Sequence, residues 1–108
     1  KHIRAMRHHY LSARDALRSD IKSYFPADTR ISYPQGGYVL WVELNSRYDS
    51  VKLADEAKQK GIYVAPGQLF SATGKYRHCL RFNFIDSTQA ARTEAIQRLG
   101  EMLVAQEA

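Results

Sequence analysis

Cysteine is almost absent from this chain: Cys79 is the only one among 108 residues. An internal disulfide is therefore excluded, and a single thiol fits a reducing compartment, so we expect a cytoplasmic protein. Long apolar runs are missing too. The longest uncharged apolar stretch, residues 33–42, falls far short of the roughly 20 residues that cross a bilayer. A signal peptide has an apolar run after its basic start, and residues of that kind do not follow the basic start here. We therefore expect no membrane partner.

Acidic residues are scarce at the beginning of the chain, where basic ones gather. The formal net charge is +5, and residues 1–22 account for +4 of it. Such a segment is typical either of a solvated helix face or of a surface that attracts nucleic acid. Its six basic side chains are Lys1, Arg4, Arg7, Arg14, Arg18 and Lys22.

Length and composition are those of one globular domain, residues 1–108, with a core of its own. Apolar residues recur every three or four positions over residues 2–24, which predicts an amphipathic helix that Pro26 ends. The pattern is already under way at the first residue, with no capping residue before it. We therefore expect the chain to have been cut from a longer one.

Two further helices follow from the same kind of pattern, over residues 51–60 and 88–105. Gly61 stands where a glycine commonly caps the C-terminal end of a helix. The candidates for the N-terminal caps of the two helices are, in chain order, Asp49 or Ser50 and Asp86 or Ser87.

Four runs rich in β-branched and aromatic residues predict strands. The first two flank the turn sequence Pro-Gln-Gly-Gly and could pair as a hairpin, and Pro66-Gly67 halts the third ahead of a loop over residues 67–77. The order α-β-β-α-β-β-α predicts an α+β fold, in which helices pack on one face of a small, mostly antiparallel sheet. The predicted strands are residues 30–33, 38–44, 62–65 and 79–84.

Metal ligands and catalytic pairs are hard to assemble from this sequence. Adjacent histidines such as His8 and His9 point about 100° apart on a helix, so we expect no metal site. His78 precedes Cys79, but neighbours in a strand point to opposite faces, so His78 is not expected to act as a base for Cys79. We expect Cys79 to be an inert, buried or half-buried thiol. Phosphate-binding loops and RNA-binding aromatic motifs are missing as well.

One arginine stands out in the last predicted strand. Leu80, Phe82 and Phe84 alternate with Cys79, Arg81 and Asn83, which indicates one buried and one open face. Arginine suits a carboxylate because its planar fork donates two parallel hydrogen bonds, and a strand holds it rigidly. The alternative is a solvent-facing arginine on a one-sided sheet.

Three motifs occur together in this chain: PQGGYVLWVEL, GIYVAPGQLF and LRFNF. In this order and spacing they resemble the C-terminal small domain of fold-type I pyridoxal-phosphate (PLP) aminotransferases, over nearly the whole chain. Within that superfamily the sequence is most similar to MocR-type regulators of the GntR family and to aminoadipate-type aminotransferases. MocR-type regulators join a winged-helix DNA-binding domain to an aminotransferase-like domain.

The resemblance implies that Arg81 binds the α-carboxylate of an amino-acid ligand, in a cleft between the small domain and a large one. Asn83 on the same strand, the turn at Gly37 and, at the mouth of the cleft, Tyr38 are implied to line the ligand site, with Pro66-Gly67 at its border.

The family's Schiff-base lysine and phosphate-binding groups lie in the large domain, and no lysine here matches that motif. This chain alone is therefore expected neither to hold PLP nor to catalyse transamination. The full-length protein is implied to be a homodimer. Three readings stay open: a MocR-type regulator that binds DNA through an N-terminal domain, a true aminotransferase, and a free-standing α+β interaction module.

Overall fold

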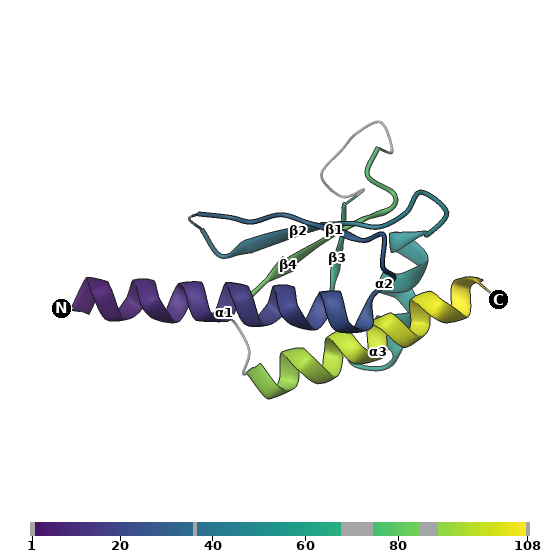
Figure 1. Cartoon of the computed structure of the whole chain (residues 1–108). Coiled ribbons are helices and arrows are strands. Elements are labelled where there is room, and N and C mark those ends of the chain that lie inside the picture. Colours follow the sequence, from purple (N-terminus) through teal and green to yellow (C-terminus); the bar gives the residue numbers. More distant parts are fainter. Residues whose placement is uncertain (1, 36, 68–74, 85–88, 108) are drawn as a thin grey trace.

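The computed structural model in Figure 1 describes residues 2–35, 37–67, 75–84 and 89–107, with side chains from residue 7 to 106 within those ranges except that of residue 89. The order of its helices and strands is the predicted one. The elements are α1 (His2–Tyr24), β1 (Arg30–Ile31), β2 (Val39–Glu43), α2 (Ser50–Gln59), β3 (Ala65–Pro66), β4 (Cys79–Asn83) and α3 (Gln89–Glu107).

The four strands form one sheet in the order β1-β2-β4-β3, and every pair is antiparallel. The predicted hairpin of β1 and β2 is confirmed. The central pair, β2 and β4, runs in register from Val39 opposite Asn83 to Glu43 opposite Cys79. This register decides which side chains of the two strands become neighbours on each face of the sheet.

Helices α1 and α3 lie side by side beneath the sheet, as Figure 1 shows, and α2 packs against α3 and β3 near one end. The predicted α+β arrangement is therefore confirmed. Gly100 of α3 lies against the last turn of α1, where a Cβ atom would meet the carbonyl oxygen of Tyr24. The fully buried apolar side chains come from every layer: Ile21, Leu40, Val42, Leu53, Ala57, Leu80, Phe84, Leu99 and Leu103.

The ends of α2 follow the predicted chemistry. Asp49 is the N-cap, and its carboxylate accepts hydrogen bonds from the backbone N–H groups of Val51 and Lys52 at 3.0 and 3.1 Å. Gly61 has φ +80°, the left-handed conformation that glycine adopts without strain. The cap candidates Asp86 and Ser87 lie outside the described residues.

The predicted strand over residues 62–65 was wrong in position. The strand comprises Ala65 and Pro66, which pair with Arg81 and Leu80 of β4. Proline has no N–H to donate, and a sheet tolerates it at an edge, which is where β3 lies. None of the helices within the described residues combines the length and apolar character that crossing a membrane requires.

Candidate functional site

The two faces of β4 differ as the alternation predicts. Leu80 and Phe84 are fully buried and Phe82 is half-buried on the side of the helices. Arg81 and Asn83 point to the other side and are exposed. Arg81 stands opposite Trp41 of β2 and Ala65 of β3, so its backbone is held by strands on both sides. That mount suits a side chain that must keep a fixed position.

Arg81 and Asn83 also line a cavity of about 560 Å³. Its other walls are the segment from Gly61 to Val64, Leu17 of α1, Phe82 and side chains of α3, so the cavity lies mainly on the side of the helices. Residues 61–64 come directly before β3, which is an edge strand of the sheet. The cavity therefore lies at this edge. Arg81 and Asn83 therefore border the cavity at the sheet edge, although β4 directs them to the open face.

Gly37 and Tyr38 lie next to the same end of β4. The backbone N–H of Phe84 donates a hydrogen bond to the Tyr38 carbonyl at 3.1 Å, so the turn before β2 meets the end of β4. Gly37 has φ +77° and open space around the position of a Cβ atom. The Tyr38 ring is 48% exposed and contacts Tyr10 of α1, with ring centroids 5.9 Å apart. It therefore faces the helices, not the side of Arg81.

The segment before that turn is bound to α1 by two arginines. The Arg14 guanidinium lies 3.9 Å from the centre of the Tyr33 ring and donates a hydrogen bond to the Pro34 carbonyl at 3.1 Å. Arg18 lies 4.7 Å from the same ring and donates to the Ser32 carbonyl at 3.0 Å. These two charges of the basic first helix therefore hold the segment before the turn against α1, and the buried one, Arg14, is taken up by that contact.

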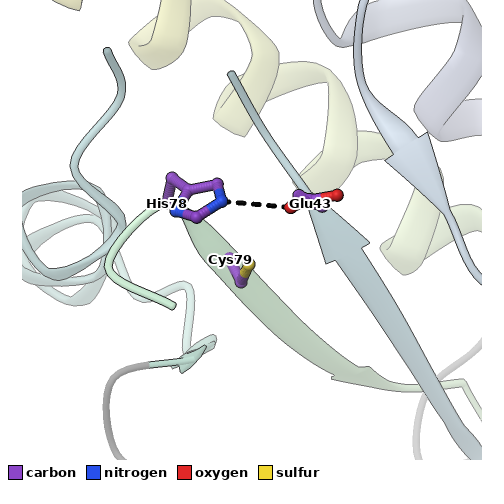
Figure 2. Close-up of side chains that lie close together, drawn as sticks. All are labelled: Glu43, His78 and Cys79. Carbon is purple, nitrogen blue, oxygen red and sulfur yellow. Dashed lines mark hydrogen bonds and ion pairs between the residues drawn. The ribbon is translucent and has the colours of Figure 1, made fainter. Parts of the chain in front are cut away.

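A second group of side chains lies at the opposite end of β2 and β4. Figure 2 shows Glu43, His78 and Cys79 converging, and their donor atoms all lie within 4.8 Å of one another. His78 Nε2 and Glu43 Oε2 are 3.2 Å apart. The expectation that His78 and Cys79 point apart was wrong.

The physical reason is the turn that precedes β4. The strand begins only at Cys79, whose N–H donates to the Tyr76 carbonyl at 2.9 Å, and Tyr76 has φ +65°. The period-two rule holds inside strands, so it does not apply to His78. Glu43 joins the group because the register sets it opposite Cys79. Sequence reasoning missed Glu43 because the register between β2 and β4 cannot be read from either strand alone.

Cys79 is buried, as expected, with 1% of its surface exposed although it lies on the open side of the sheet. Gly67 covers it so closely that a Cβ there would lie 2.8 Å from the Cβ of Cys79. Burial, together with the charge of Glu43, raises the pKa of the Cys79 thiol, and a hydrogen bond from the Trp41 side chain opposes that shift. A thiol of this kind is a poor nucleophile.

Comparison with known proteins decides the family. The family model for aminotransferase class I and II matches residues 1–99. This chain belongs to that family. A solved relative, kynurenine aminotransferase from Pyrococcus horikoshii, has a TM-score of 0.88 and 30% identity, covering 99% of this chain and 26% of that one.

Two curated relatives point to different kinds of parent protein. An uncharacterized HTH-type transcriptional regulator of Escherichia coli strain K12, YjiR, is 40% identical over 94% of this chain and 22% of its own length. A 2-aminoadipate transaminase of Thermus thermophilus is 25% identical over 94% of this chain and 25% of its own length. The chain thus spans about a quarter of the length of the proteins it matches.

The lysines of the described residues lie away from the cavity that Arg81 and Asn83 border. A Schiff-base lysine must stand in the site beside the substrate. Every described lysine is exposed, and none lines the cavity with Arg81 and Asn83. These lysines are Lys22, Lys52, Lys58, Lys60 and Lys75.

Proposed function

We propose that this chain is the C-terminal small domain of a MocR/GntR-type transcriptional regulator, whose aminotransferase-like part binds PLP and an amino compound. The observation that carries the proposal is the 40% identity to an HTH-type regulator over 94% of this chain. Membership of the aminotransferase family accounts for the ligand-binding part. DNA would be bound by a separate N-terminal domain.

Arg81 is the carboxylate clamp in this proposal. Its guanidinium can donate two parallel hydrogen bonds to a carboxylate, and the strands on both sides hold its backbone in place. Asn83, two residues along the same face, can add an amide hydrogen bond. Gly37 has φ +77°, the left-handed conformation that the turn beside this end of β4 needs and that glycine adopts without strain.

The cofactor would be held by the large domain of the same chain, since the described lysines lie elsewhere. When bound, PLP supplies an electron sink for chemistry at the α-carbon of an amino acid. The small domain contributes the group that binds and orients the carboxylate. We further propose that the full-length protein is a homodimer, and that the isolated small domain neither retains PLP nor transaminates.

The proposal is tested with Arg81→Ala in the full-length, PLP-loaded protein. Loss of one partner of a desolvated charge pair should weaken amino-acid binding by about 2–5 kcal/mol, measured by calorimetry. Arg81→Lys should also weaken it, because a point charge does not replace the fork. The matched control is Arg30→Ala, an 85% exposed arginine at the other end of the sheet. Unchanged amino-acid affinity in Arg81→Ala would rule out the clamp.

The second candidate is a true aminotransferase of the 2-aminoadipate type, which the similarity to the Thermus transaminase favours. A gel-shift assay of the full-length protein, with and without PLP and amino acids, separates the two. Specific DNA binding that responds to the ligand supports the regulator. Turnover of an amino acid and a 2-oxo acid without DNA binding supports the enzyme.

A further inference from the structure

The cluster of Glu43, His78 and Cys79 combines three of the side chains that bind transition metals. Cysteine sulfur, histidine nitrogen and a carboxylate are all ligands of Zn²⁺, and three protein ligands plus a water complete its tetrahedral shell. The three donor atoms lie within 4.8 Å of one another and come from neighbouring strand ends. We propose that these residues form a zinc-class metal site, in which water takes the fourth position.

The geometry is close to what such an ion needs. With bonds of about 2.0–2.3 Å, tetrahedral ligands stand roughly 3.3–3.7 Å apart. His78 Nε2 and Glu43 Oε2 are 3.2 Å apart, just below that range, so this pair needs little change. The three donors lie within 4.8 Å of one another, so the proposed site requires side-chain rotations that close the remaining gap between the sulfur of Cys79 and the other two donors.

Access and charge also fit. The His78 and Glu43 side chains are 28% and 44% exposed, so an ion and a water can enter from their side, while Cys79 is buried behind Gly67. Binding replaces two protons with metal bonds: the thiol proton of Cys79, and the proton that His78 Nε2 shares with Glu43 Oε2. The thiol proton leaves to water and the imidazole proton moves to Nδ1 or to water, so a dication meets a thiolate, a neutral imidazole and a carboxylate. Arg30 is the other partner of Glu43, at 3.9 Å and 85% exposed, and can move away.

The sulfur has an outer-shell partner as well. The Trp41 side chain makes a hydrogen bond to the Cys79 side chain. Because indole nitrogen only donates, this bond supports a thiolate ligand. The mixture of sulfur, nitrogen and oxygen donors disfavours Mg²⁺ and Ca²⁺, which take oxygen ligands.

The test is a titration of the full 108-residue chain with Co²⁺, a spectroscopic substitute for Zn²⁺, in a thiol-free reducing buffer. Cys79 is the only cysteine, so a sulfur-to-cobalt charge-transfer band reports this residue alone. We expect an equimolar band that Zn²⁺ abolishes and that Cys79→Ser lacks. His78→Gln and Glu43→Gln should each weaken Co²⁺ binding by more than about a hundredfold, beyond the roughly 10–100-fold that the loss of an outer-shell partner costs.

The control removes two exposed histidines of α1, with His8→Gln and His9→Gln combined, and should leave the band unchanged. Circular dichroism checks that each variant is folded. If buried Cys79→Ser fails to fold, the two more exposed variants decide. The proposal is overturned if the folded wild-type chain gives no charge-transfer band. It is also overturned if the band keeps its affinity in both His78→Gln and Glu43→Gln.

Discussion

The two faces of the sheet are built from the same strands but differ in composition, burial and role. The face toward α1 and α3 is apolar and closed, with Leu40, Val42, Leu80 and Phe84 at 0% exposure. The other face carries Arg81, Asn83 and the Glu43 cluster, and much of it meets solvent. Burial of apolar area stabilises the fold, whereas exposed polar side chains add little to stability. The closed face therefore supplies most of the stability of the domain, and the open face carries the polar side chains that can bind a ligand or an ion.

The sharpest contrast should come from Leu80→Ala on the closed face. Leu80 is fully buried opposite Val42, so its truncation leaves a cavity in the core. We expect the free energy of unfolding to fall by about 2–5 kcal/mol. Urea denaturation measures it. A loss below about 1 kcal/mol would contradict the view that the closed face carries the stability.

Gly100→Ala probes the seam between the two helices under the closed face. Alanine normally stabilises a helix relative to glycine by up to about 1 kcal/mol. Here its methyl group would meet the backbone of Tyr24, so we expect a loss of about 1–3 kcal/mol instead. The matched control is Gln97→Ala, an exposed position of α3, which should change stability by less than about 0.5 kcal/mol. Thermal denaturation of both variants shows whether the sign reverses at Gly100 alone.

A polar contact at the start of α2 should have a smaller, pH-dependent effect. Burial raises the pKa of Asp49, but hydrogen bonds from Arg77 and from the backbone of Lys52 and Val51 outweigh it, and the pKa falls below the ordinary 3.8. A carboxylate with a depressed folded-state pKa stabilises the fold above 3.8, and this contribution is lost as pH falls through the folded-state value.

Asp49→Ala should therefore cost about 0.5–2 kcal/mol at neutral pH, since it also removes the N-cap. The difference from wild type should shrink in acid below pH 3.8. Asp49→Asn is the control that keeps a capping oxygen and removes the charge. Urea denaturation across the pH range measures the free energy of unfolding of both variants. If the loss in Asp49→Ala does not change with pH, the charge of Asp49 does not contribute to stability as assigned here.

The smallest effect on stability is expected for Arg81→Ala. Arg81 is exposed on the open face, and surface substitutions usually change stability by less than about 0.5 kcal/mol. The stability of the Arg30→Ala variant should change equally little. Differential scanning calorimetry of the two variants tests this, and a large loss in Arg81→Ala alone would give this side chain a structural role. Equal stability would make any loss of ligand affinity in Arg81→Ala attributable to binding.

Much of the fold follows from local sequence patterns. The spacing of apolar residues located α1, α2 and α3, and alternation located β4 and its two faces, because helix and strand periods are properties of the local chain. Gly61 was predicted as a cap from its own chemistry, as was an N-cap at Asp49 or Ser50, of which the structure shows Asp49. β3 was misplaced because its two residues pair with β4 at a sheet edge, and nothing local indicates an edge.

Sequence by itself determined the family motifs, the helices and the open-face position of Arg81, since each depends on residues close together in the chain. Only the tertiary structure decided the rest. Strand register brought Glu43 to Cys79, and a turn at Tyr76 rotated His78 toward both. The packing of α1 turned the Tyr38 ring away from Arg81 and drew Arg14 onto Tyr33. Contacts between distant segments depend on how whole elements pack, which the period of a short stretch does not encode.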